Sequence, residues 1–178
     1  DDGSWKNLEA VVVGDSVIGV DPTTGKSMPT RVLNTFRSGL KQVWTIVGEN
    51  VSFRATDEHQ VPVVYARDSY GASRPLPIKT SVLDIRLNLA TPSCKPFVLA
   101  VMSDGLTRFE ELLGYYDAGI SECGDLEVEH TAHCYVTRYI LAQPGVVVSN
   151  SKTETALAHV VQLATGMCSE ALDPITKL

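Results

Sequence analysis

The sequence has few cysteines, no basic cluster and no long apolar run, and each shortage argues against a class of protein. Four cysteines in 178 residues stand at irregular spacings without a Cys-x-x-Cys pair. They therefore predict no disulfide scaffold and favour a reducing, cytoplasmic compartment. A net charge of −6 argues against binding to nucleic acid, and no apolar run approaches the roughly eighteen residues of a membrane span. With 44% hydrophobic residues, the chain is suited to one compact domain.

Short β-rich segments separated by Gly, Ser and Asn dominate the chain as far as Asn150. Strands this short, with turns this close together, predict an all-β domain. The expected strands are EAVVV, SVIGVD, TRVLNTF, QVWTIVG, VSFRAT, FVLAVMS, DLEVEH and TRYILAQPGVVV. Residues 66–96 are expected to be a loop-rich insertion around one strand, SVLDIRLNLA, while LTRFEELLGYY stays open between a short helix and a strand.

The pattern changes after Asn150, where SKTETALAHVVQLATG follows. Ser151 and Glu154 have the spacing of a capping box, and Gly166 suits a helix end. Apolar residues recur between them at helical spacing, so the sequence predicts a C-terminal helix. Two interpretations are open at this point: a junction between two proteins at Asn150, or a helix that packs on its own domain.

The junction itself reads GVVVSNS, a β-branched run that ends in Ser149-Asn150-Ser151. Asn and Ser are ordinary turn residues, so a polar turn is one interpretation. The other is chemical. An Asn side-chain amide attacks its own main-chain carbonyl through a five-membered ring, and this reaction cuts the chain before the hydroxyl residue.

RATDEHQVPV carries Thr56 and His59, three residues apart after an expected strand. Residues i and i+3 face opposite sides of a strand, so both reach one site only if the chain turns at Asp57-Glu58. A hydroxyl and an imidazole that meet over one peptide bond are able to polarise its carbonyl and protonate its departing nitrogen. The alternative is a surface turn with an exposed histidine.

GDLEVEHTAHCYV carries Asp125, His130, His133 and Cys134. The alternation predicts a half-buried strand with Asp125 on the face opposite its apolar neighbours. A zinc site that adds Cys123 is one alternative, although the spacing fits no usual zinc pattern. A solvated acidic strand with scattered histidines is the other.

Taken together and in this order, these segments resemble a Hint domain, the fold of inteins and hedgehog-type autoprocessing domains. DGSWKNLEAVVVGDSVIGVD is similar to the first half of that domain, and RATDEH is similar to the intein Thr-x-x-His block. DLEVEHTAHCYV resembles the downstream block, and GVVVSNS resembles the C-terminal splice junction. The resemblance covers residues 1–151. The Asn followed by Ser points to an intein of the splicing kind.

The resemblance implies an upstream step and a transfer step. Thr56 and His59 would strain and protonate the upstream scissile peptide. Asp125 would help to activate the downstream nucleophile, and Ser151 would be that nucleophile. No metal or organic cofactor is implied, because the chain is both catalyst and substrate in a single turnover.

The resemblance also implies a final cut, in which Asn150 cyclises with the help of His133. Ser149 stands where inteins usually carry a penultimate His, and Ser is an accepted variant there. The predicted domains are therefore the intein over residues 1–150 and a flanking segment, the C-extein, over residues 151–178. Residues 60–124 are too few for the usual two-motif homing endonuclease, so a mini-intein is expected.

The upstream nucleophile, a Cys or Ser that heads the usual first strand, is absent ahead of Asp2-Gly3. We expect it on a short N-terminal intein fragment that carries its own extein, in an atypically split intein. A chain shortened to stop the reaction, or one given without its beginning, remains open. The alternatives in function are a Hint domain that performs only C-terminal self-cleavage, and an inert β-rich binding module.

Overall fold

A computed structural model describes residues 5–66, 76–91, 94–102, 105–138, 143–149, 155–156 and 160–162. The elements in chain order are β1 (Trp5–Asn7), the 3₁₀ helix η1 (Leu8–Ala10), β2 (Ser16–Val20), β3 (Ser27–Gly48), β4 (Ser52–Ala55), β5 (Gln60–Ala66), β6 (Ile78–Ser81), α1 (Val82–Leu89), β7 (Lys95–Val101), β8 (Thr107–Val128), β9 (Cys134–Arg138), β10 (Gly145–Ser149), β11 (Thr155–Ala156) and β12 (Val160–Gln162). The expected all-β class is confirmed.

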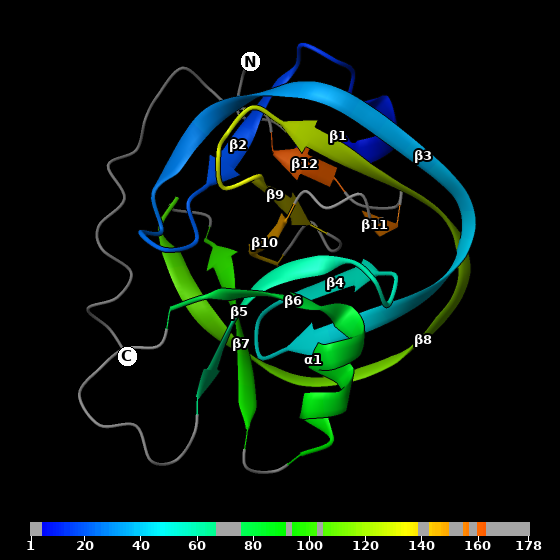
Figure 1. Cartoon of the computed structure of the whole chain (residues 1–178), viewed down its shortest axis with the longest axis vertical. Helices are drawn as coiled ribbons and strands as arrows, with labels where there is room; N and C mark the ends of the chain where they lie inside the picture. The colour runs from blue at the N-terminus through cyan, green and yellow to red at the C-terminus, as the bar shows by residue number, and fades with distance from the viewer. Residues whose placement is uncertain are drawn as a thin grey trace.

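The strands of the described residues form one 12-stranded sheet that curves around a central core. Its order is β1-β12-β9-β2-β3-β4-β11-β8-β7-β5-β6, and β10 joins β9 to β7. Figure 1 shows β3 and β8 sweeping side by side around the rim while the shorter strands cross the interior. Antiparallel pairing throughout places segments from both ends of the chain next to one another.

Strands β3 and β8 make a long bent ribbon in which the expected breaks are bulges. TRVLNTF and QVWTIVG were expected to be separate strands, but β3 runs through Ser38 and Gly39 without ending. The β3–β8 register shifts between Arg37 and Gly39, and Gly39 has a φ of 76°, which glycine adopts at little cost. Each such shift bends the ribbon, so one strand covers two sides of the core.

Two expected strands are wrong. SVLDIRLNLA is mainly the helix α1, in which Val82 and Ile85 are buried at helical spacing. The Ser81 hydroxyl accepts a hydrogen bond from the Asp84 backbone N–H at 3.1 Å and so caps the first turn. EAVVV instead begins with η1, and Val12 and Val13 are more than half exposed.

The expected C-terminal helix is also wrong where the structure describes that segment, because Thr155–Ala156 and Val160–Gln162 are strands. Strand β11 pairs with β4 and β8, and β12 pairs with β1 and β9. These pairings supply backbone hydrogen-bond partners from the main sheet, which override a local helical pattern.

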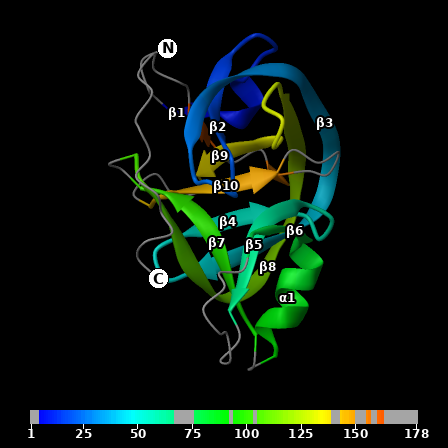
Figure 2. The same ribbon diagram turned by 60° about the vertical axis from the view of Figure 1, so that its left-hand side comes forward.

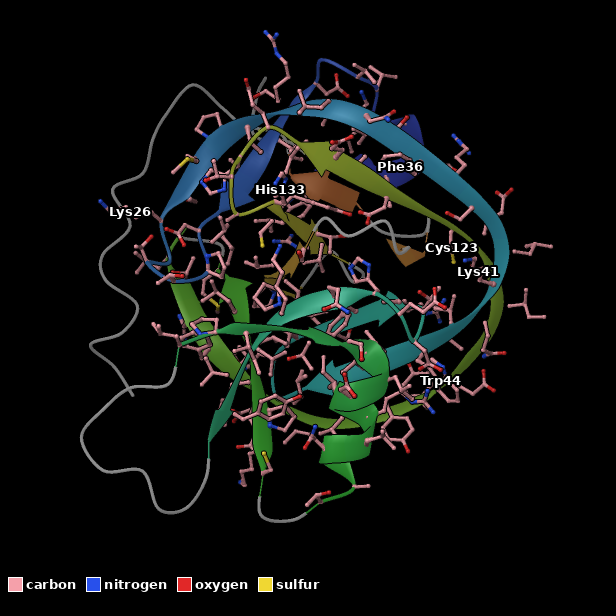
Figure 3. The ribbon with its side chains drawn as sticks, viewed as in Figure 1. Lys26, Phe36, Lys41, Trp44, Cys123 and His133 are labelled. Carbon is pink, nitrogen blue, oxygen red and sulfur yellow. The ribbon has the colours of Figure 1, made fainter. Side chains whose placement is uncertain are left out.

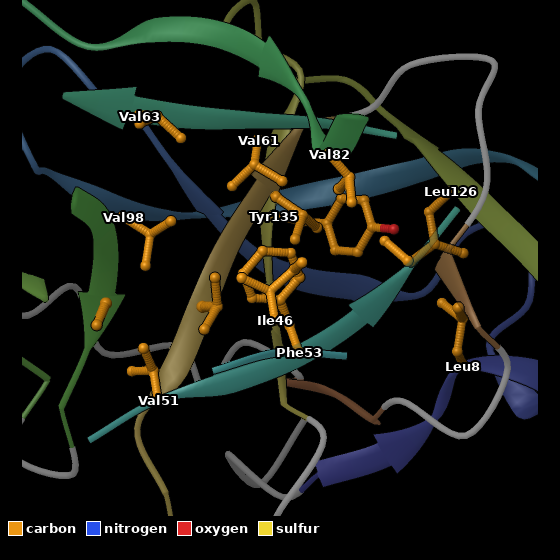
Figure 4. Close-up of a cluster of buried hydrophobic side chains, with 14 of the residues drawn as sticks. Leu8, Ile46, Val51, Phe53, Val61, Val63, Val82, Val98, Leu126 and Tyr135 are labelled. Carbon is orange, nitrogen blue, oxygen red and sulfur yellow. The ribbon is translucent and has the colours of Figure 1, made fainter. Parts of the chain in front are cut away.

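The main core lies inside the ribbon and draws on almost every strand (Figure 4). Ile46, Phe53, Leu126 and Tyr135 are among its largest fully buried side chains. Gly145 marks a close approach at the start of β10, because a Cβ there would lie 2.5 Å from a Val136 methyl carbon. Among the described elements there is no helix with the length and hydropathy needed to cross a membrane.

Candidate functional site

Thr56 and His59 lie in a tight turn between β4 and β5. The His59 backbone N–H donates to the Thr56 carbonyl at 3.1 Å, so the chain turns at Asp57-Glu58 as expected. Thr56 is 5% exposed and His59 is fully buried. The alternative of a surface turn with an exposed histidine is therefore wrong, and the hydroxyl and imidazole residues are both held in the interior.

Asp125 lies in the interior near the end of β8. The Tyr135 hydroxyl donates to Asp125 Oδ1 at 2.7 Å, and the Leu126 backbone N–H donates to the same oxygen at 2.8 Å. Asp125 is 1% exposed, so the solvated acidic strand is wrong. The expected half-buried pattern fails here because the bent ribbon is covered on both faces, and Asp125 and Leu126 are both buried.

A small cavity of about 30 Å³ opens beside Asp125, with Leu8, Phe36 and Arg37 among its lining residues. This volume is enough for a water molecule. A buried carboxylate needs hydrogen-bond donors to hold its charge, and the Tyr135 hydroxyl is one of them. Figure 4 shows the Tyr135 ring packed in the core with its oxygen directed toward Leu126, the neighbour of Asp125.

Replacing Tyr135 by Phe is expected to lower the free energy of unfolding by about 1.5–3 kcal/mol, the usual range for a hydrogen bond to a charged group. Urea denaturation followed by intrinsic fluorescence measures the loss. Tyr116→Phe is the matched control, because Tyr116 is 52% exposed on the same strand as Asp125. Equal stability losses in the two variants would contradict this role for Tyr135.

His133 lies in the loop directly before β9, and the neighbouring strand expected for it is wrong (Figure 3). It is exposed and has a φ of 50°, while its backbone N–H donates to the His130 carbonyl at 2.8 Å. Residues other than glycine seldom adopt this backbone conformation, although histidine does so more often than most. The loop therefore fixes the point at which the His133 side chain leaves the backbone.

Strands β9 and β10 run side by side (Figure 2), and their register brings the two ends of the site together. Ser149, the last residue of β10, pairs with Cys134, the first residue of β9. The next residues along the two strands are Asn150 and His133. Asn150 and Ser151 themselves lie outside the described residues.

Cys134 and Ser149 are both fully buried at this strand pair. Burial raises the pKa of the Cys134 thiol to about 11, although Lys79 and a hydrogen bond with Ser149 act in the opposite direction. The Cys134 thiol donates to the Ala132 carbonyl at 3.2 Å. Within the described residues no group of three His, Cys, Asp or Glu side chains is arranged to hold a metal ion.

Strand β11 relates Thr56 to Asp125. Thr155 pairs with Ala55 on β4 and with Gly124 on β8. These partners are the chain neighbours of Thr56 and Asp125, so both residues lie beside the same short strand. The fold thus gathers three regions of the sequence around β11 and the β9–β10 pair.

No family model matches the sequence, and no curated protein matches it either. Solved structures do match. A DnaB intein from Synechocystis sp. PCC 6803 is 13% identical with a TM-score of 0.54 and covers 92% of this chain and 96% of its own. The DnaX mini intein from Spirulina platensis is 19% identical with a TM-score of 0.50 and covers 76% and 81% of the two chains.

The chain has the Hint fold of inteins. Within this Hint fold, Thr56, His59 and Asp125 are brought into the interior, and His133 lies at the end of the β9–β10 pair. Tyr135 was missed from the sequence. Its position after His133-Cys134 gave no sign that it would reach Asp125 on β8, because that contact crosses from one strand to another.

Proposed function

We propose that residues 1–150 are an intein and residues 151–178 its C-extein, and that the chain splices after it binds a short N-terminal intein fragment. The register that pairs Ser149 with Cys134 carries the proposal. If that register continues, Asn150 comes beside His133. The Tyr135–Asp125 hydrogen bond then connects β9 to the other proposed catalytic carboxyl group.

The upstream step begins with a Cys or Ser on the N-terminal fragment. Its sulfur or oxygen bonds to the upstream carbonyl carbon, and the bond from that carbon to the amide nitrogen breaks. His59 gives a proton to the departing nitrogen, while Thr56 polarises the carbonyl. The product is a thioester or ester that still carries the upstream segment.

The transfer step uses the Ser151 hydroxyl, which attacks this ester as Asp125 accepts its proton. The N-terminal nucleophile leaves, takes a proton and stays on the intein, so a branched chain forms at Ser151. Both reactants belong to one assembly, and effective molarity therefore replaces the encounter of two molecules.

The last step frees the product. The Asn150 side-chain nitrogen bonds to its own carbonyl carbon, and the bond from that carbon to Ser151 nitrogen breaks. The side-chain nitrogen loses one proton and the departing amine gains one, with His133 assisting. A succinimide remains at Asn150, and the ester at Ser151 then moves to the free amine to form an ordinary peptide bond.

The partner would dock as a strand, because β-strand addition lets backbone groups provide affinity. The positions now held by β11 and β12 support this, since each accepts an added strand between two others. We place the intein in the reducing cytoplasm with its host. Among the described residues, Cys94, Cys123 and Cys134 form no disulfide.

Intact mass after incubation tests the proposal. The chain is incubated alone and with the Cys- or Ser-headed segment encoded upstream of it or in a separate frame. Splicing yields a new joined product only when the segment is added. Release of residues 151–178 in both mixtures, without a joined product, indicates C-terminal cleavage alone, and unchanged masses indicate a binding module.

Thr56→Ala is expected to slow the upstream step by about a hundredfold while C-terminal release stays within roughly twofold, because it removes a group that acts on one carbonyl only. Mass spectrometry follows the ester and the free C-terminal fragment in the same sample. Thr23→Ala, at an exposed turn, is the control. Equal slowing of both steps by Thr56→Ala would contradict the assignment.

A further inference from the structure

Helix α1, which has no part in the chemistry above, holds the Thr56–His59 turn. Its first backbone N–H groups point at the turn: Val82 donates to the His59 carbonyl at 2.9 Å, and Leu83 donates to the Asp57 carbonyl at 2.9 Å. The first N–H groups of a helix lack partners within the helix. Here they fasten the turn at both of its ends.

A charged pair adds a side-chain connection between the same two segments. The Arg86 guanidinium of α1 donates to the Asp57 carboxylate, within the turn itself. The Arg86 side chain is 15% exposed and that of Asp57 is 39% exposed, so the pair is partly shielded from water. Shielding matters because fully exposed pairs contribute little.

Arg86 is itself held by two aromatic rings of the bent ribbon. Its guanidinium carbon lies 3.3 Å from the Trp44 ring centroid and 4.9 Å from that of Tyr115. The two rings meet edge to face at 6.0 Å. A planar guanidinium is able to stack on a ring and bind a carboxylate at the same time, which a lysine ammonium does less well. Figure 3 shows Trp44 beside α1.

The strand register ties this group to the catalytic turn by a second route. Trp44 pairs with Ala55, the residue before Thr56. The position of Thr56 is therefore set from one side by β3 and that of Asp57 from the other by α1. Movement of Arg86 would loosen the link between them.

We propose that Arg86 and Asp57 are positioning residues for the upstream step. Through the Asp57 carboxylate, Arg86 keeps the turn in the shape that directs Thr56 and His59 to the upstream scissile peptide. The inference rests on the proposed splicing function for its chemical meaning. Its structural content, that Arg86 sets the conformation of the turn, is independent of whether the chain splices.

The first experiment measures the turn directly by NMR. The full chain with Asn150→Ala is used, which we expect to stay intact. Arg86→Ala is expected to speed hydrogen exchange of the Leu83 amide by about tenfold and to shift the ring signals of His59. Arg86→Lys keeps the charge without the planar stack and should give a smaller change. Lys95→Ala, which breaks the Lys95–Glu111 pair on another part of the sheet, is the control.

The second experiment compares two rates in one sample, with the N-terminal segment added. A geometric effect on the turn is expected to slow ester formation by about ten- to a hundredfold in Arg86→Ala, while release of residues 151–178 stays within twofold. Arg86→Lys should recover part of the lost rate. A merely stabilising role for Arg86 would instead slow both steps together or neither.

The outcomes separate the two proposals. Wild-type chain that forms no ester overturns the proposed function, while the exchange data still judge the turn. Unchanged Leu83 exchange and His59 signals in Arg86→Ala overturn the positioning role. So does a parallel loss of both rates in that variant. Changed signals with a selective loss of ester formation support it.

Discussion

Asn150→Ala is expected to abolish release of residues 151–178 under all conditions. The reaction breaks the bond after Asn150 by attack of the side-chain nitrogen, and Ala has no such nitrogen. An intramolecular amide held one ring away from its target is not easily replaced by another group. The expected effect is therefore complete loss of release, which exceeds the slowing expected from any change to an assisting residue.

The strand that ends at Ser149 explains why a single residue carries the step. Residues Gly145–Ser149 form β10 and are all buried, and Val146–Val148 are stiff β-branched residues. A strand fixed this tightly delivers the next residue with a defined orientation, and cyclisation requires such a near-attack geometry. A loose turn would seldom reach it.

Mass spectrometry under denaturing conditions is the measurement, with two diagnostic products: a free fragment that starts at Ser151, and a succinimide at Asn150. Asn34→Ala is the matched control, because Asn34 is exposed on the bent ribbon far along the sequence. Release of the Ser151 fragment from Asn150→Ala would end the splicing assignment and leave Ser149-Asn150-Ser151 as a turn.

The second-largest effect is expected at His133, whose replacement by Ala should slow C-terminal release by about a hundredfold or more, the usual scale for a lost general acid or base. The reason is its place in the β9–β10 register, one residue before Cys134, the partner of Ser149. An imidazole there is able to protonate the departing Ser151 nitrogen. The rate constant for release, followed by mass, checks this.

The backbone at His133 requires a second variant. With a φ of 50°, Ala at this position strains the loop in addition to removing the imidazole. His133→Asn tolerates that conformation better and should lose the same rate, since it too lacks the acid. His130→Ala, in the same loop, should change the rate by less than about tenfold. Wild-type release from His133→Asn would contradict the role.

The sequence predicted the fold class and the catalytic turn, because both depend on patterns a few residues long. Thr56 and His59 are joined by a local hydrogen bond, and the short β-rich runs report directly on strands. The order of the four segments was enough to indicate a Hint domain. These features need no knowledge of what packs where.

The failures all arise from partners distant in sequence. SVLDIRLNLA alternates well enough to suggest a strand, yet the Ser81 cap and the contact with the Thr56–His59 turn make it a helix. SKTETALAHVVQLATG has a helical pattern, yet its described residues pair with four other strands. Sequence periodicity does not show which sheet positions are available.

Burial at Asp125 could not be read for the same reason. Its neighbours alternate like a strand with one wet face, but the bulges of β3 bend the ribbon around it. Tyr135 and Arg86 were missed because each acts across elements. Nothing in HCYV or DIRLN announces a contact with a residue on another strand or turn.

The pairing of β11 and β12 separates cutting from departure. Breaking the bond after Asn150 leaves Thr155–Ala156 and Val160–Gln162 hydrogen-bonded to strands on both sides. The severed piece would then be a bound peptide with its own residence time, and the two parts would travel as one stoichiometric complex on a sizing column. Turnover of the assembly would be set by strand dissociation, a slow physical event after the fast chemical ones.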